Sequence, residues 1–305
     1  MLIGHAVSRC AVVGERERSI LAAMSTAPET RPRSGDEAAP PAAALADVAR
    51  AGDYDRYLTV LFAPIEARPA LLALIALNLE LARVRDAVVE PMIGQIRLQW
   101  WRDTVGEALA GRPRNHQVLQ AIADSRTRLN AGLIEDMIDA REIELGDPPA
   151  SLDAFERYCA GTSGALAEAM AVALGAKQEA EGAREVGTAF GMIGVLRSVR
   201  WQAERGRVLL PGDVLVQSGA SLEALRRLRS EPALADAARR IADAARAHLS
   251  PTVAKSKAAL LLAPLAKVYL RRLGAVNYDL LGADLSLSPL RKQLAVGWAA
   301  FTGRF

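Results

Sequence analysis

Four charged side chains fall within two turns of a strongly apolar segment, residues 67–88, and these are the first residues in the chain that could do chemistry. They are Glu80, Arg83, Arg85 and Asp86. A helix that is apolar nearly all round is typical of a protein interior, where charges must pair or face a solvated cavity. Arg83 and Asp86 have the i,i+3 spacing of a simple ion pair at an exposed helix end. Of these two interpretations we favour the cavity.

A second group of acidic side chains comes from residues 135–142. Glu135, Asp139 and Glu142 share one face of a predicted helix, with Asp136 beside them. Such a face could hold a metal ion, but a solvated acidic face on a surface helix is far commoner. We therefore predict a surface helix here and no metal site.

The histidines are scattered. His5, His116 and His248 have no Ser, Cys or paired carboxylate at a telling spacing, which argues against His-based catalysis. The segment Gly161–Gly164 is too short and isolated to be a phosphate-binding loop. Neither feature predicts a catalytic centre.

Two tryptophans and two cysteines are expected to have structural roles. Trp100 and Trp101 are adjacent, which favours one indole in the core and the other at a groove or interface. Cys10 and Cys159 lie far apart with no CxxC pair, which indicates a reducing compartment and no structural zinc. We expect both to be buried or tail thiols.

The composition favours a large helical domain. The 305 residues are 51% hydrophobic and only 5% aromatic, with Ala and Leu prominent, so helices are favoured and a large core can form. The net charge of +3 and the lack of a basic stripe argue against nucleic-acid binding. No stretch reaches the roughly 18 uninterrupted apolar residues of a membrane span. Charged residues also interrupt any signal-peptide core near the N-terminus. We expect a cytoplasmic protein.

The first 45 residues differ from the rest. Residues 28–41 hold four prolines among polar and small residues, a composition that cannot bury enough apolar surface to fold. We predict a disordered tail over residues 1–45 without chemistry. Because Met24 is a plausible initiator, residues 1–23 could be an artefact of start-site choice.

From residue 46 onward the pattern is helical. Apolar residues recur at three- and four-residue spacing, without alternating Val/Ile/Thr runs. This predicts one all-α domain over residues 46–305. We expect its helices to break at Pro64, Gly111–Arg114, Gly146–Pro149, Gly175, Pro211–Gly212, Pro251 and Pro264.

The segment Lys257–Arg272 has an apolar body and basic ends. This pattern suits a helix pair resting on an anionic membrane surface. The alternative, that its leucines pack in the domain core, is at least as well supported by the sequence.

Three segments carry a resemblance to a known family. Residues 64–78, 158–164 and 205–211 (Arg-Gly-Arg-Val-Leu-Leu-Pro) resemble, in order and spacing, the signature elements of the squalene/phytoene synthase family. The resemblance covers about residues 53–300. It implies an all-α isoprenoid synthase fold around a central cavity. Working members join two prenyl diphosphates head to head, using Mg²⁺ held by aspartates on two facing helices.

Most of those aspartates are replaced in this chain. The first motif falls on Ala82, Arg83 and Asp86, and the second on Ser198 and Gln202. The family's Ser-Phe near the start of the domain falls around Asp55 and Arg56. The resemblance implies that Ala82 and Asp86 face Ser198 and Gln202 across the cavity. One carboxylate cannot hold Mg²⁺, so we expect no metal or other cofactor and no catalytic residues.

The replacements themselves match one branch of the family. Residues 78–86 and 93–102 resemble a non-catalytic branch that takes part in the assembly of respiratory complex I. In this interpretation the cavity accepts an anionic lipid or prenyl diphosphate directly, because guanidinium groups bind phosphate without metal. The candidate anion-binding residues are Arg83, Arg197, Arg200, Arg205 and Arg207.

The resemblance therefore leaves three hypotheses open. The first is a complex I assembly factor in the cytoplasm or at the periphery of the inner membrane, with complex I subunits as partners. The second is a prenyltransferase that uses an unusual Mg²⁺ arrangement. The third and weakest is a lipid- or isoprenoid-binding protein at the membrane surface.

Overall fold

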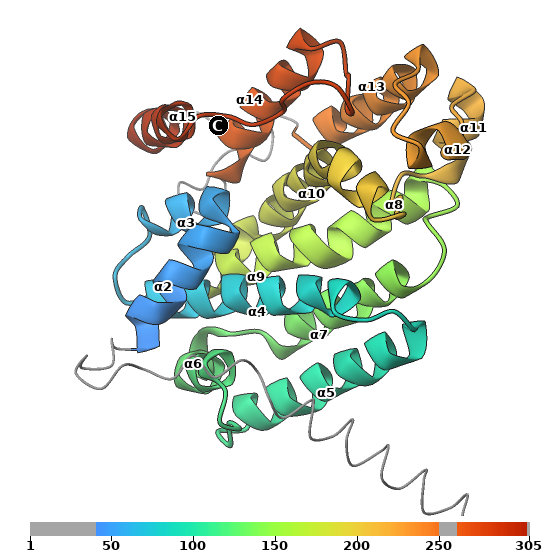
Figure 1. The fold of residues 1–305 in the computed structure, drawn as a ribbon. Helices are drawn as coiled ribbons and strands as arrows, with labels where there is room; N and C mark the ends of the chain where they lie inside the picture. The colour runs from blue at the N-terminus through green and yellow to red at the C-terminus, as the bar shows by residue number, and fades with distance from the viewer. Residues whose placement is uncertain (1–40, 250–260, 304–305) are drawn as a thin grey trace, which may run out of the picture. The chain divides into compact units, whose positions relative to one another are not determined.

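The computed structural model describes residues 41–249 and 261–303, and every regular element in these ranges is a helix (Figure 1). This confirms the predicted all-α fold. The α-helices are α2 (Pro41–Gly52), α3 (Tyr54–Val60), α4 (Arg68–Asp86), α5 (Pro91–Leu109), α6 (Gln117–Ser125), α7 (Ala131–Asp139), α8 (Leu152–Cys159), α9 (Ala165–Ala173), α10 (Ala180–Glu204), α11 (Gly212–Ser218), α12 (Leu222–Arg226), α13 (Pro232–Ala247), α14 (Leu262–Ala275) and α15 (Pro289–Thr302).

The helical domain begins earlier than the sequence indicated. Helix α2 starts at Pro41, so residues 41–45, which we assigned to the tail, are part of the fold. A proline is tolerated in the first turn because the N–H that it lacks would have no partner within the helix there. Leu45 is only 2% exposed and fixes this turn to the core. Residues 1–40 of the predicted tail, including Cys10 and His5, lie outside the described residues.

Most predicted helix breaks are confirmed. Chain turns follow α3 at Pro64, α5 at Gly111–Arg114, η2 (Ala140–Leu145) at Gly146–Pro149, α9 at Gly175, and α10 at Pro211. The break at Pro264 is wrong, because Pro264 lies in the first turn of α14, where proline is tolerated. Pro251 lies outside the described residues.

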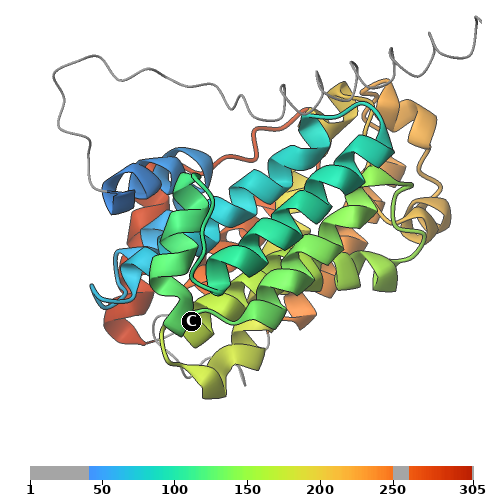
Figure 2. The ribbon, with the colours of Figure 1, turned by 90° about the horizontal axis from the view of Figure 1, so that it is seen from below.

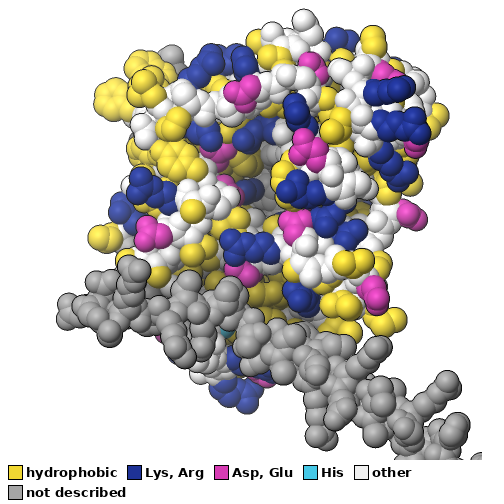
Figure 3. Space-filling view, in the orientation of Figure 1, with side chains coloured by type: hydrophobic (Ala, Val, Ile, Leu, Met, Phe, Trp, Pro, Cys, Tyr) yellow, Lys and Arg dark blue, Asp and Glu magenta, His cyan; other side chains and the backbone are white. Residues whose placement is uncertain are grey.

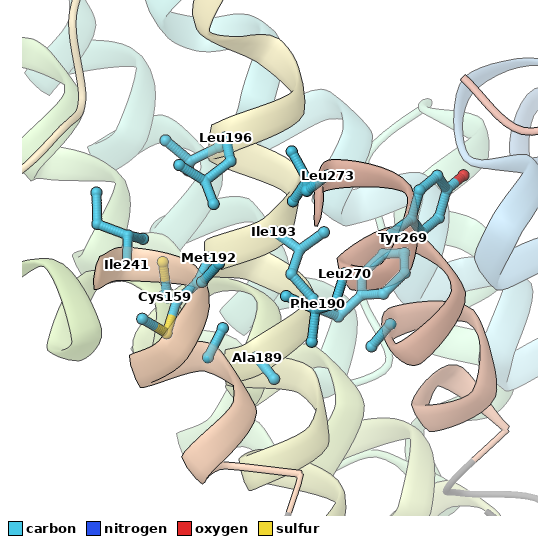
Figure 4. Close-up of a cluster of buried hydrophobic side chains, with 14 of the residues drawn as sticks. Cys159, Ala189, Phe190, Met192, Ile193, Leu196, Ile241, Tyr269, Leu270 and Leu273 are labelled. Atoms are coloured by element: carbon cyan, nitrogen blue, oxygen red, sulfur yellow. The ribbon is translucent and has the colours of Figure 1, made fainter. Parts of the chain in front are cut away.

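Helix α10 is the centre of one of two apolar cores. It packs against α8, α9, α13 and α14, and Figure 1 places it between these helices. Figure 4 shows Met192, Ile193 and Leu196 from α10 pointing toward Ile241 of α13 and Leu273 of α14. The hydroxyl of Tyr269 points away from this cluster, toward the α3 side.

Helix α4 is the centre of the second core. Residues 73–77 are completely buried, as its apolar sequence predicts. The helix packs against α2, α6 and α9. Figure 2 shows α4 and α5 running side by side. The charged C-terminal turn of α4 is thereby held at the edge of a rigid core.

The predicted membrane segment 257–272 packs inward where it is described. Leu262, Leu265 and Leu270 are buried in the α10 core, which agrees with the packing alternative. Residues 257–260 lie outside the described residues. No helix within residues 41–249 or 261–303 has both the length and the hydropathy of a membrane span.

Candidate functional site

A cavity of about 470 Å³ opens between the C-terminal turn of α4, the α8–α9 junction and the second half of α10. Loop residues 146–148 and 206–209 complete its wall. The site therefore combines elements from both cores.

Four of the five motif positions line this cavity. Ala82 and Asp86 come from α4, and Ser198 and Gln202 come from α10. Each pair has i,i+4 spacing, which puts both members on one helix face. The structure brings these residues to one space, as the resemblance implied.

The two motif positions on the α10 side of the cavity are polar and uncharged. The Gln202 amide donates to the Ser198 hydroxyl over 2.6 Å, and this hydroxyl donates to the Val195 carbonyl over 3.0 Å. Gln202 Oε1 is buried and has no hydrogen-bond partner among the described residues. The side chains at these two positions therefore bond chiefly to their own helix.

Asp86 is the retained carboxylate of the first motif, and it is already paired. Its Oδ1 forms an ion pair with an Nη of Arg207, which follows α10 in the chain. The other Nη of Arg207 donates to the Arg85 carbonyl over 3.3 Å. Arg207 therefore neutralises Asp86 and joins the end of α4 to the loop after α10.

Of the five candidate anion-binding arginines, Arg207 is the one that the described cavity wall contains. Arg83 is exposed and pairs with Glu80 at 2.6 Å. This is the simple i,i+3 pairing that we weighed for Arg83, with Glu80 as the partner instead of Asp86. Since Ala82 and Asp86 face the cavity, Arg83 lies one helix position off that face.

Arg200 and Arg205 also point away from the cavity. Arg200 donates to the Leu281 carbonyl over 2.8 Å. The Arg205 guanidinium stacks on Trp201, 4.1 Å from the ring centroid. Both side chains lie outside the cavity lining. The structure therefore does not bring them to the candidate anion site.

Arg197 belongs to a different charged cluster, centred on Asp55. Its guanidinium lies 3.7 Å from the centroid of the Tyr269 ring and 3.6 Å from Asp55 Oδ2. Asp55 also accepts a hydrogen bond from the Tyr269 hydroxyl at 2.7 Å and pairs with Lys292 at 2.8 Å. Burial raises the pKa of Tyr269. Asp55 thus ties together α3, α10, α14 and α15.

Sequence reasoning missed a buried network in the cavity wall. Arg141 pairs with Glu144 at 2.5 Å and donates to Asn78 Oδ1 over 2.8 Å. The Tyr158 hydroxyl donates to Glu144 over 2.6 Å. Burial, and then the nearby Glu144 charge, raise the pKa of Tyr158 well above its usual range. In the sequence, only the i,i+3 spacing of Arg141 and Glu144 could have indicated this ion pair.

Arg56 is a second cationic wall residue that the sequence did not single out for binding. It is buried, pairs with Asp53 at 2.6 Å and donates to the Ser163 hydroxyl over 2.6 Å. Its Nε has no hydrogen-bond partner among the described residues. Ser163 lies in the π-helical turn η3 (Ala160–Gly164) and donates to the Gly187 carbonyl over 2.6 Å.

Gly187 explains how η3 approaches α10 so closely. A Cβ at this position would lie 2.6 Å from the Ser163 carbonyl oxygen, a contact that a side chain cannot make. We predicted that the segment Gly161–Gly164 is not a phosphate-binding loop. In the structure it packs against α10 and places Ser163 against Arg56.

The wall does not fit Mg²⁺, the ion that the family resemblance would bring here. Mg²⁺ needs several oxygen ligands in a near-octahedral array. Asp86 is paired with Arg207, and Glu144 with Arg141 and Tyr158, so Asp147 is the one further carboxylate in the described wall. Within the described ranges no three His, Cys, Asp or Glu side chains are grouped as metal ligands. With Arg56, Arg85 and Arg141 also in the wall, the site favours an anion over a cation.

The acidic group of residues 135–142 is neutralised by arginines. Asp139 and Glu142 both pair with Arg102, and Asp136 pairs with Arg184 at 2.9 Å. Glu135 is exposed. These carboxylates link α7 and η2 to α5 and α10 as surface ion pairs.

The tryptophans and the described cysteine lie as the sequence indicated. Trp101 is buried, Trp100 is half-buried, and their rings meet edge to face at 5.0 Å.

The two described histidines and the described cysteine have partners or are buried. The His116 ring contacts the Trp101 ring edge to face at 5.3 Å between centroids, and His248 Nδ1 lies 2.6 Å from Glu185 Oε2. Cys159 is buried beside the cavity, and burial raises the pKa of its thiol.

The comparisons with known proteins agree with this architecture. A family model described as squalene/phytoene synthase matches residues 49–291. A dehydrosqualene synthase crystal structure superposes with a TM-score of 0.70 at 16% identity, covering 85% of this chain and 94% of the other. The squalene synthase of Alicyclobacillus acidocaldarius gives a TM-score of 0.60 at 15% identity, covering 86% and 94%. At these identities the structures show the shared fold alone.

Two curated relatives are more similar in sequence. The Rattus norvegicus protein named NADH dehydrogenase (ubiquinone) complex I, assembly factor 6 is 31% identical over 251 residues, which cover 78% of this chain and 75% of that protein. The phytoene synthase of Thermus thermophilus is 30% identical over 274 residues, which cover 86% and 93%.

Proposed function

The chain belongs to the squalene/phytoene synthase family, and we propose that it is a non-catalytic member that assists the assembly of respiratory complex I, the NADH:quinone oxidoreductase. It works at the cytoplasmic face of the inner membrane and contacts subunits of the complex before they are fully assembled.

The ion pair between Asp86 and Arg207 carries the non-catalytic part of the proposal. Ionisation of a prenyl diphosphate in this family requires Mg²⁺ held between two carboxylate-bearing helices. Here one helix offers a carboxylate already bound to a guanidinium, and the other offers Ser198 and Gln202. The chain has no free carboxylate at these positions with which to hold the metal.

In the proposed role the cavity keeps a ligand without turning it over. Arg85 lies at the end of α4 and Arg207 in the loop after α10, and the buried Arg56 and Arg141 complete the basic part of the wall. Guanidinium groups bind phosphate or diphosphate by charge-assisted hydrogen bonds without a metal. Phe190, Gly191, Gly194 and Val195 offer a less polar surface next to these charges. An anionic lipid or a prenyl diphosphate has both of the required parts.

The complex I part of the proposal is supported by the assembly factor 6 relatives, which match most of the chain at about 30% identity. The Bos taurus relative carries the same name, and the Drosophila melanogaster relative is named as a homolog of assembly factor 6. Fold likeness does not by itself fix a client, so this part rests on sequence similarity.

The second candidate function is a prenyltransferase that joins two prenyl diphosphates head to head. The specific observation in its favour is the phytoene synthase relative, which the match covers almost end to end. This alternative needs a metal arrangement other than the two aspartate helices.

Deletion of the gene separates the two candidates. The proposal expects less assembled complex I on native gels and normal isoprenoid pigments and hopanoids. Intact complex I together with missing isoprenoid products would support the prenyltransferase and reject the assembly role.

A further inference from the structure

The C-terminal helix α15 turns an apolar face to solvent. Leu290, Leu294, Trp298 and Phe301 follow helical spacing and are 64%, 63%, 69% and 86% exposed. We call these four residues the α15 stripe. In Figure 3 hydrophobic side chains gather over α15 at the upper left, whereas basic and acidic side chains are interspersed over the rest of this view. Exposed apolar patches of this kind mark interaction surfaces.

The opposite face of α15 is firmly held, so the stripe is a fixed feature of the fold. Val296 and Ala299 are buried in the α10 core. Lys292 reaches inward to Asp55 at 2.8 Å, and Gln293 donates to the Tyr54 hydroxyl over 2.9 Å. These contacts anchor α15 and leave the stripe on its outer face.

A second exposed apolar group follows α3, the helix against which α15 packs. Leu61, Phe62 and Ile65 lie in the turn after α3 and are 45%, 44% and 76% exposed. In Figure 1 α15 lies above α3, and the segment after α3 descends from there toward α4 at the left of the view.

The charge around the stripe is positive. Helices α14 and α15 pack together and contain no Asp or Glu. Of their basic residues, Arg271 and Arg291 are exposed and Lys267 and Arg272 are half-buried, whereas Lys292 is already paired with Asp55. The acidic residues nearest in the chain, Asp279 and Asp284, are in the connecting loop, where both accept hydrogen bonds from nearby backbone N–H groups.

We propose that the α15 stripe docks this protein on an anionic lipid bilayer. Leucine, tryptophan and phenylalanine on one helix face enter the boundary between headgroups and acyl chains, and neighbouring lysines and arginines attract anionic lipids. The four exposed side chains of the α15 stripe can enter a lipid surface because lipids move aside to accommodate them. This inference deepens the proposed function, because a factor that assembles a membrane complex has to reach the membrane.

Vesicle co-sedimentation of the purified full chain tests the inference. The probe is phosphatidylcholine vesicles with or without phosphatidylglycerol. We expect binding to the vesicles that contain phosphatidylglycerol and weaker binding at high salt. Leu294→Gln with Trp298→Gln lowers the partition coefficient about tenfold or more, because two large apolar side chains leave the lipid contact. Both side chains are exposed, so the variant keeps its fold, as circular dichroism will show.

The matched control is Val216→Gln on α11, a residue that is 80% exposed and outside the stripe; it leaves binding unchanged. Equal binding by the double variant, or no binding by the native chain, overturns the inference. Self-association that the double variant abolishes, without vesicle binding, assigns the stripe to a second copy of the chain and also overturns it. The assay needs no client protein, so its failure is distinct from a failure of the deletion experiment.

Discussion

Asp86 at the end of α4 and Arg207 after α10 form an ion pair across the edge of the cavity. The pair joins α4, which carries the first motif, to the loop that follows the second motif on α10. The Arg207 guanidinium neutralises the carboxylate retained from the first motif, so that this carboxylate is not free to bind a metal.

We therefore expect no prenyl transfer by the purified chain. Incubation with Mg²⁺ and farnesyl or geranylgeranyl diphosphate should yield no squalene, presqualene or phytoene product above background, because the metal has no ligand set. Extraction and chromatography of the products measure this. The Thermus thermophilus phytoene synthase is a suitable positive control. Turnover that Asp86→Ala abolishes would show that the chain is an enzyme.

The cavity should bind a diphosphate without metal. We expect calorimetry in the presence of EDTA to show binding of farnesyl diphosphate, and Arg85→Gln to weaken it about tenfold, because a charge-assisted hydrogen bond is lost. Arg83→Gln is the matched control, since Arg83 is on the same helix but outside the cavity wall and paired with Glu80. Binding that appears only after Mg²⁺ is added would contradict the arginine-based site.

Glu144 should be important for stability. Glu144→Gln leaves the Arg141 guanidinium buried without its counter-charge and lowers the free energy of unfolding by about 3 kcal/mol or more. Urea denaturation measures this change. Glu107→Gln removes one partner of the exposed pair with Arg114 and should leave stability unchanged within error. A Glu144→Gln variant as stable as the native chain would mean that the buried network contributes little.

We expect His116 to lower the free energy of unfolding at acidic pH. Burial holds the pKa of His116 below its usual range. The unfolded chain therefore takes up a proton near pH 6.5 before the folded chain does, and this contribution to stability is lost as the pH falls below that value. NMR titration should give a lower midpoint for His116 in the folded protein than in urea. Equal midpoints would show that the ring is solvated.

The fold and the motif positions could be predicted because both depend on local sequence. The apolar run of α4 fixes which residues are buried, and the 3.6-residue period then sets the direction of Ala82 and Asp86. That these two residues, and Ser198 and Gln202 on α10, face a cavity was implied by the resemblance to the family's two motifs and not by the periodicity alone.

The arginine partners could not be predicted in this way. Arg197 and Arg200 are close in sequence to Ser198, yet they point to Asp55 and to the Leu281 carbonyl. Those partners are far away in the chain, and long flexible side chains take whichever carboxylate or carbonyl the tertiary structure presents. The link between Arg141 and Asn78 was missed for the same reason.

Complementation of a deletion strain tests the central claim most directly. The measurement is NADH:quinone oxidoreductase activity in membranes, with isoprenoid lipids analysed in the same cells. We predict that deletion lowers this activity and leaves the lipids unchanged, and that the native chain and Asp86→Asn restore it equally, because no metal-dependent step is involved. Normal NADH:quinone oxidoreductase activity together with altered isoprenoid lipids that only the native chain restores would contradict the account.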